Sequence, residues 1–176
     1  MIQPKIIDSI NLHSLNKFLS VSDRYYKHKY CVKFTSKEQN LDQRVSFHTN
    51  RICMISLGEN HTVMKNNKKI LKINCSIDNK INRLLNATSG KGKRGAQKLT
   101  ENSVLCYIEC EDGDIYPVYS CVQGKLLEIN EHLISNPNLL ITNPVSKGYI
   151  ALILPTLNLY ESIKNSMLDA DEYSKI

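Results

Sequence analysis

The chain has 176 residues, of which 41% are hydrophobic, so it is long enough to form one domain with its own apolar core. No apolar run approaches the roughly 18–20 residues of a membrane-spanning helix, and the segment Met1–Lys5 does not open a signal peptide. We therefore expect a protein that is neither secreted nor bound to a membrane.

The net charge of +6 is distributed unevenly along the chain. Residues 61–98 contain ten Lys and Arg but only one acidic residue, Asp78, whereas residues 99–176 contain four basic and eleven acidic residues. A basic middle beside an acidic C-terminal third allows a strong surface dipole. Two interpretations stay open: an acidic partner, either nucleic acid or an acidic protein surface, or an ordinary solvated basic face.

The cysteines predict neither a disulfide framework nor a metal site. A chain of this length does not need disulfides to stabilise its core, and most of the cysteines lie in apolar runs such as Arg51–Ile55. No CxxC pair is present and the five histidines are scattered, which argues against a zinc site. We expect buried, reduced thiols at Cys31, Cys53, Cys75, Cys106, Cys110 and Cys121.

In chain order, residues 1–44 are predicted to form an N-terminal helical arm and a polar loop. Asp8 or Ser9 can cap a helix over residues 8–30, where apolar residues recur at partly helical spacing. Residues 35–44 are polar, so we place the boundary with the folded core at this loop.

From residue 45 the hydrophobic period changes to that of strands. Residues 78–100 are polar and glycine-rich, which predicts a long loop with one helical turn near residues 81–85. Many short strands at short spacing predict a barrel or sandwich, to which we assign residues 45–156. The predicted strands cover residues 51–57, 70–77, 104–109, 115–122, 125–129 and 148–154.

The clearest local signal is a hairpin formed by the strands on either side of Asp112 and Gly113. This dipeptide readily supplies the positive φ of a type I′ turn. Pro117 cannot donate a ladder hydrogen bond, so the second strand is expected at a sheet edge or a bulge. The carboxylates at the tip fit a turn better than an acid/base pair, because nothing apolar surrounds them to raise a pKa.

The C-terminal residues 157–176 are predicted to close the fold with a helix. Leu159, Ile163 and Met167 form one apolar stripe of an amphipathic helix over residues 157–168. Helices are therefore expected only near the two ends of the chain.

No motif of an enzyme stands out. The run Gly90–Gly95 formally matches GxGxxG, but dinucleotide binding requires that motif between a strand and a helix, and here β structure follows. No GxSxG, HExxH or Walker sequence is present. We expect no catalysis, no cofactor and no small-molecule substrate.

The same glycine-rich stretch carries the candidate partner-binding residues Lys91, Lys93, Arg94 and Lys98. A flexible basic loop can follow phosphates or acidic side chains, because glycines let backbone donors approach a ligand. The alternatives are a solvated loop in which residues 95–97 serve a tight turn, or a contact on the N-terminal arm around Arg24, Lys27 and Lys29.

Part of the C-terminal half resembles the glycine cleavage H-protein. The similar runs are Val122–Glu131, Asn136–Leu140, Asn143-Pro144 and Gly148-Tyr149. This resemblance implies a mainly β, lipoyl-type barrel-sandwich hybrid with helices near the N- and C-termini, in which a hairpin tip bears a lipoylated lysine. The carrier lysine would fall at about Gly113, and the tip Glu109–Asp114 contains no lysine, so we expect no lipoylation.

A longer set of runs, from about residue 24 to residue 155, includes Lys93–Gln97, the run Lys-Arg-Gly-Ala-Gln. The others are Arg24-Tyr25, Asn50–Cys53, Ser89–Lys91, Leu99–Glu101, Ser120–Val122, Gly148–Ala151 and Leu154-Pro155. Together they resemble the Abitram family, also called Simiate, the actin-binding transcription modulators. Membership implies binding of G- and F-actin, a role in filopodia and neurite branching, and localisation to nuclear speckles as well as actin-rich cell projections.

Three functions follow from these patterns. The first is a non-enzymatic actin-binding regulatory protein, since the acidic surface of actin suits a basic segment. The second is a nucleic-acid-associated nuclear protein that uses residues 61–98. The third, an H-protein-like lipoyl carrier, conflicts with the missing lysine at the hairpin tip.

Overall fold

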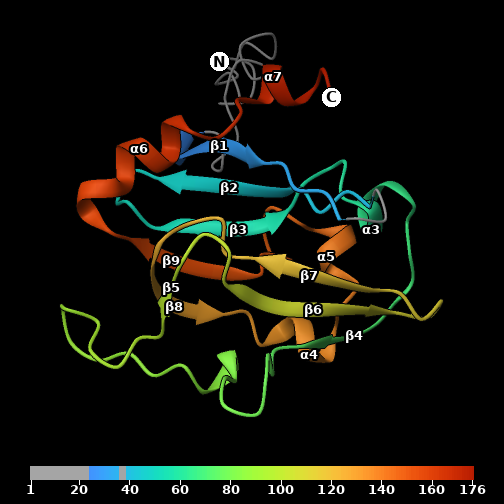
Figure 1. The fold of residues 1–176 in the computed structure, drawn as a ribbon, viewed down its shortest axis with the longest axis horizontal. Helices are drawn as coiled ribbons and strands as arrows, with labels where there is room; N and C mark the ends of the chain where they lie inside the picture. Colours follow the sequence, from blue (N-terminus) through green and yellow to red (C-terminus); the bar gives the residue numbers. More distant parts are fainter. Residues whose placement is uncertain (1–23, 36–38) are drawn as a thin grey trace, which may run out of the picture.

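The structure, a computed structural model, describes residues 24–35 and 39–176, which form two antiparallel β-sheets around one hydrophobic core (Figure 1). The first sheet has six strands, in the spatial order β1 (Tyr26–Cys31), β2 (Gln43–His48), β3 (Cys53–Leu57), β9 (Ala151–Pro155), β8 (Gly124–Ile129) and β5 (Lys98–Leu99). The second has three strands, in the order β4 (Ile70–Asn74), β6 (Val104–Cys110) and β7 (Ile115–Tyr119). This architecture confirms the predicted mainly β fold and is consistent with a barrel-sandwich hybrid.

The core is built around β3, which lies between β2 and β9 in the larger sheet. All five residues of β3 are buried, so neither of its faces is open to water. Ile55 and Ile153 of the larger sheet share one buried cluster with Ile108 and Val118 of the smaller sheet. Full burial of such side chains contributes about 1.5–3 kcal/mol each to folding.

The predicted helix over residues 8–30 is wrong at its C-terminal end. Residues Tyr26–Cys31 form β1, which pairs along its whole length with β2. The signal for a strand is the alternation of ring-bearing residues with lysines in Tyr-Lys-His-Lys-Tyr, which has a period of two. The larger sheet thus begins at β1, and residues 1–23 of the expected arm lie outside the described residues.

The closing helix over residues 157–168 is also wrong in length. Residues 157–176 contain three short helices instead, η3 (Leu157–Leu159), α6 (Tyr160–Asn165) and α7 (Ala170–Tyr173). Between α6 and α7, Leu168 exchanges two backbone hydrogen bonds with Tyr30 of β1, at 2.9 and 3.1 Å. The ring of Tyr173 stacks on that of Tyr30 with centroids 3.9 Å apart, so the C-terminal segment packs against β1 (Figure 1).

Further short helices lie inside the β domain, where only a turn near residues 81–85 was predicted. They are α3 (Thr62–Lys65), η2 (Arg83–Leu85), α4 (His132–Ser135) and α5 (Leu139–Thr142). The 3-10 turn η2 confirms the expected turn, whereas the other three are single turns whose residues carry no clear helical period. Over residues 24–35 and 39–176, no helix has the length and apolar character to cross a bilayer.

The predicted hairpin is formed by β6 and β7, and β7 is an edge strand, as Pro117 indicated. The type I′ turn is wrong, because Gly113 alone at the tip has a positive φ, +86°. Gly113 N–H donates to the Cys110 carbonyl at 3.1 Å, and Cys110 N–H donates to the Asp114 carbonyl at 2.9 Å. In this three-residue loop only the final residue, Gly113, is left-handed, so Asp112 does not need the positive φ that a type I′ turn would require.

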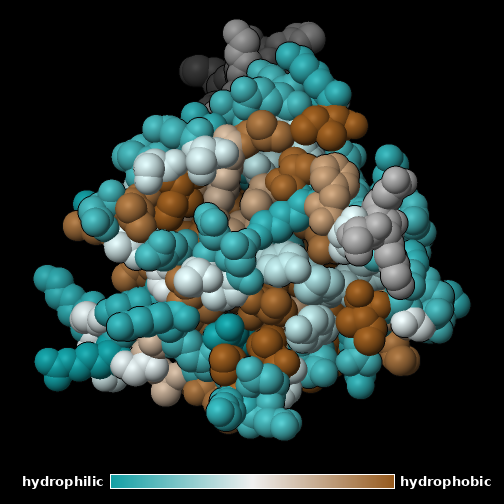
Figure 2. Space-filling view, viewed as in Figure 1, coloured by the Kyte–Doolittle hydropathy of each residue, from teal (hydrophilic) through white to brown (hydrophobic). Residues whose placement is uncertain are grey.

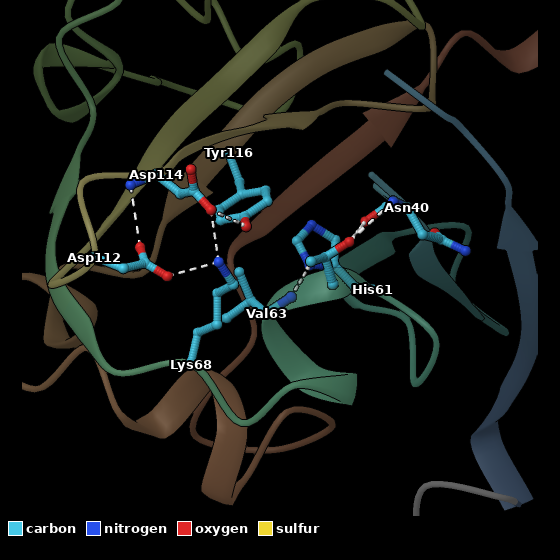
Figure 3. Close-up of polar contacts among 8 residues, drawn as sticks. Asn40, His61, Val63, Lys68, Asp112, Asp114 and Tyr116 are labelled. Atoms are coloured by element: carbon cyan, nitrogen blue, oxygen red, sulfur yellow. Dashed lines mark hydrogen bonds and ion pairs between the residues drawn. The ribbon is translucent and has the colours of Figure 1, made fainter. Parts of the chain in front are cut away.

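His61, which precedes α3, is fully buried, with 0% of its surface exposed. Its Nδ1 accepts a hydrogen bond from Val63 N–H at 3.2 Å and so caps α3 (Figure 3). The ring meets that of Tyr116 edge-on at a centroid distance of 5.9 Å, and Nε2 has no hydrogen-bond partner. Burial lowers the pKa of His61 from 6.5 to about 4, because the charged ring loses its hydration.

This pKa predicts that the stability of the fold decreases as the pH is lowered. Between pH 6.5 and pH 4 the unfolded chain binds a proton at His61 that the folded chain does not, so acidification favours unfolding. The expected loss is on the order of 3 kcal/mol across that window, at about 1.4 kcal/mol per unit of pKa difference. Urea unfolding at a series of pH values measures it.

A His61→Asn variant is the control, because Asn keeps a capping acceptor but does not titrate. Its free energy of unfolding is expected to vary less over the same window. Parallel pH profiles for the two proteins would show that His61 is not the group responsible.

Candidate functional site

The basic loop (residues 86–98) joins η2 to β5 and projects from one end of the molecule, at the lower left of Figure 1. Its tip is held in a tight turn, in contrast to the flexible loop that its glycines predicted. Ser89 and Arg94 exchange two backbone hydrogen bonds at 3.0 and 2.9 Å, and Lys93 N–H donates to the Gly90 carbonyl at 3.1 Å. Lys93 itself has a φ of +49°, so the turn has a defined shape that fixes where its side chains leave the backbone.

The base of the basic loop is anchored through Gln97. Its backbone N–H donates to Asn86 Oδ1 at 2.8 Å, and its side-chain Nε2 donates to the Asn82 carbonyl at 2.8 Å. Arg83 Nη1 donates to Gln97 Oε1 at 2.7 Å, and Asn86 Nδ2 in turn donates to two carbonyls of β8. Gln97 is therefore a structural residue that ties the loop to the sheet.

The four predicted contact residues lie on this loop without acidic partners. Lys91, Arg94 and Lys98 are exposed and Lys93 is half-buried. None of the four forms an ion pair or a side-chain hydrogen bond with the described residues. Figure 2 shows hydrophilic side chains projecting from this end of the molecule. Positive charge here stays available to an external partner.

Lys125 adds a fifth cation that sequence reasoning missed. It lies opposite Lys98 in the ladder between β5 and β8, and its Nζ donates to the Gly92 carbonyl at 2.7 Å. Like charges directly across a strand pair repel each other, which favours a negative partner between them. No sequence signal connects Lys125 with the loop, because the register of a two-residue strand cannot be read from periodicity.

Arg51, in the turn between β2 and β3, is a second cation that sequence reasoning missed. It lines a pocket of about 620 Å³ together with Lys91 of the basic loop. The apolar part of this pocket includes Leu157 and Tyr160, and Leu157 is 68% exposed. The arrangement of two cations beside exposed apolar groups suits an acidic protein segment that carries a hydrophobic side chain.

The hairpin tip, where the carrier lysine of an H-protein would fall near Gly113, is bound by a lysine from another segment (Figure 3). Lys68 Nζ lies 2.6 Å from a carboxylate oxygen of Asp112 and 2.6 Å from one of Asp114. These contacts raise the pKa of Lys68, because they favour its charged form; Asp112 has the larger effect. An amine must be neutral to attack an acyl group, so Lys68 is a poor substitute for a carrier lysine.

Most of the chain is similar to proteins named Protein Abitram. The Xenopus tropicalis protein is 42% identical over 164 residues, which cover 93% of this chain and 89% of the relative. The Homo sapiens protein is 41% identical over 157 residues, covering 89% and 86%, and the Drosophila melanogaster protein is 32% identical over 171 residues, covering 97% and 76%.

The chain belongs to the Abitram family.

Within this Abitram chain, residues 59–176 match the family model of the glycine cleavage H-protein. The fold agrees: a crystal structure of a glycine cleavage system H protein from Mycobacterium marinum has a TM-score of 0.52 over 82% of this chain and 94% of its own. Its sequence identity is 10%, so this likeness concerns the fold alone. The Abitram chain thus has the H-protein architecture without a lysine at the hairpin tip.

The anchoring role of Gln97 can be tested without changing the charge. A Gln97→Ala variant leaves Arg83 and the Asn82 carbonyl without their partner, so the free energy of unfolding should fall by about 1–3 kcal/mol. The exposed Gln123→Ala is the matched control and should change stability by less than about 0.5 kcal/mol. Equal stability of the two variants in urea unfolding would exclude the anchoring role.

The absence of a tip lysine predicts that the protein is not lipoylated. Incubation with lipoate and a lipoate ligase should leave the intact mass unchanged, because the tip offers no amine and Lys68 is held by two carboxylates. A glycine cleavage H-protein in the same reaction serves as the positive control. A mass increase by one lipoyl group, on whichever lysine, would refute the prediction.

Proposed function

We propose that this Abitram chain is a non-enzymatic, actin-binding regulatory protein and that the basic loop is its main contact with actin. The acidic surface of the partner would bind Lys91, Lys93, Arg94 and Lys98, in monomers as well as filaments. The wider role that the family resemblance implies, in actin-rich cell projections and in nuclear speckles, is part of this proposal.

The observation that carries the proposal is the uneven distribution of ion pairs within the basic segment 61–98. Three lysines of its first half are compensated by the carboxylates of the hairpin: Lys68 pairs with two of them, Lys69 lies 3.7 Å from Glu111, and Lys72 lies 3.1 Å from Glu109. Its second half, the basic loop, has no such partners among the described residues. Four of the unpaired cations of this segment therefore lie together on one anchored loop.

Charge on a solvated loop can be used for binding without loss of stability. The cations of the basic loop make no contact that the core depends on, and the loop is fixed at its base by Gln97. A fixed loop loses less conformational freedom on binding than a free coil, which leaves more of the interaction energy for affinity. Such contacts are weakened by salt, because counterions screen exposed charges.

A charge-removal variant of the basic loop tests the proposal. Lys91→Gln, Lys93→Asn, Arg94→Gln and Lys98→Gln are combined, with Asn at position 93 because it tolerates a positive φ. Exposed ion pairs contribute about 0–1 kcal/mol each, so four together should contribute about 2 kcal/mol, or roughly thirtyfold in affinity. Co-sedimentation with actin filaments and titration of labelled monomers measure the loss.

The matched control removes the same charge from the first half of the segment, through Lys65, Lys69, Lys72 and Lys80, all changed to Gln. Each variant loses four positive charges, so the net charge changes equally while the basic loop of the control stays intact. The four lysines of the control are exposed, so their loss should not disturb the core. The control should bind actin within a few-fold of the wild type, and both variants should keep its melting temperature. Wild-type affinity in the loop variant would place the contact elsewhere.

The nucleic-acid alternative is decided by the same variants. Mobility shifts of DNA and RNA across a salt series measure whether the basic loop binds phosphates. Binding of nucleic acid but not of actin, lost in the loop variant, would replace the proposed partner and keep the site.

A further inference from the structure

The cysteines do not behave as six equivalent buried thiols. All six are free, and five are buried, whereas Cys31 is partly exposed. Four of them form two pairs of neighbouring thiols: Cys31 and Cys121, which line one pocket, and Cys75 and Cys106. In the described part of the chain, no group of three or more His, Cys, Asp or Glu is placed to hold a metal ion.

The pair of Cys31 and Cys121 joins segments that are distant in sequence. Cys31 ends β1 and lies opposite Gln43 of β2 in the ladder. Cys121 follows β7 with a φ of +56°, a left-handed conformation that is strained for a residue with a side chain. Its thiol contacts Gln43 Oε1, so the Gln43 side chain lies against the dithiol.

This pair opens to solvent, whereas the other does not. Cys31 and Cys121 both line a pocket of about 440 Å³, together with Lys33. The ammonium of Lys33 is held by Asn102 Oδ1 at 2.6 Å. Cys75 and Cys106 are 3% and 0% exposed, so a reagent in solution reaches them only after the fold opens.

The two thiols of the accessible pair are made unequal by their surroundings. The neighbouring Cys121 thiol lowers the pKa of Cys31, and the charge of Lys33 acts in the same direction, whereas burial opposes both. Burial raises the pKa of Cys121, which keeps its proton. Gln43 is fully buried and its Nε2 has no partner, so its amide can also donate to a sulfur anion after a half-turn.

We infer that Cys31 and Cys121 form a peroxide-reactive dithiol site, in which a small hydroperoxide in the pocket oxidises Cys31 and Cys121 then closes an intramolecular disulfide. The inference rests on the pocket that both thiols line and on the buried Gln43, which lies opposite Cys31 in the ladder and accepts the hydrogen bond of the Cys121 thiol. It is independent of the proposed actin contact.

The chemistry balances in two steps. The thiolate of Cys31 attacks the distal oxygen of the hydroperoxide; an S–O bond forms, the O–O bond breaks, and the leaving oxygen takes up a proton to become an alcohol or water. The sulfur of Cys121 then attacks that of Cys31; an S–S bond forms, the S–O bond breaks, and hydroxide leaves as water with the proton of Cys121. Two thiols supply the two electrons that reduce the peroxide.

The test uses the full reduced chain titrated with hydrogen peroxide, quenched with an alkylating agent and digested without reductant. Mass spectrometry should show the loss of two alkylatable thiols, a mass lower by two hydrogen atoms, and a peptide that links Cys31 to Cys121. A thiol reductant should reverse all three changes. The buried pair Cys75 and Cys106 is the internal control and should stay alkylatable after denaturation.

Two variants separate the roles of the thiols. Cys121→Ser should stop at a sulfenic acid on Cys31 that dimedone captures, whereas Cys31→Ser should give neither adduct nor disulfide. Alkylation of Cys31 should also plateau at a lower pH than that of free cysteine. Two results in the wild type would overturn the inference, whatever the variants do. One is that Cys31 and Cys121 stay fully alkylatable at peroxide levels that oxidise free cysteine. The other is that the disulfide forms between other cysteines.

Discussion

The burial of β3 on both faces is the constraint on which the arrangement of the molecule depends. A strand without an exposed face needs neighbours at both edges and apolar cover above and below, and β2, β9 and the smaller sheet supply them. Polar segments are then confined to the ends of the strands, where their backbone groups reach water or side-chain partners. The basic loop, the hairpin tip and the pocket beside Arg51 all lie in such connections.

Charge distribution distinguishes these connections from one another. At the hairpin tip, carboxylates from one segment meet lysines from another, so the tip is close to neutral and held in place. At the basic loop, a network of hydrogen bonds among Arg83 and neutral polar groups fixes the backbone. The four cations of the loop take no part in this network. The same family fold therefore has a fixed tip where a carrier would present its lysine, and an uncompensated surface at the basic loop.

Patterns of short range in the sequence were sufficient for much of the fold. The buried run at β3, the hairpin around Gly113, and the edge position that Pro117 imposes each depend on neighbouring residues, and each was predictable. Family-specific runs then indicated the two-sheet architecture. The expected helix was wrong over residues 26–30, because a weak apolar repeat was given more weight than the two-residue period of β1.

The parts that were not predictable depend on contacts between distant segments. Lys68 meets Asp112 only because β4 pairs with β6, and Lys125 approaches Gly92 only because β5 pairs with β8. The contact of Cys31 with Cys121 has the same origin, since it joins the end of β1 to the turn after β7. The spacing of residues along the sequence gives no information about contacts between segments that are distant in the chain.

The backbone pairing of Leu168 with Tyr30 has a consequence for how the protein avoids self-association. β1 is an edge of the larger sheet, and an open edge is a template on which a second chain can add a strand. The C-terminal segment occupies that template at Tyr30, while β5 at the opposite edge is only two residues long. In the smaller sheet, Pro117 removes a donor from β7, and a register shift interrupts β4 between Ile70 and Lys72. Each open edge is thus blunted by a different means, and at Tyr30 the segment that contains Leu168 keeps a second chain from pairing with β1.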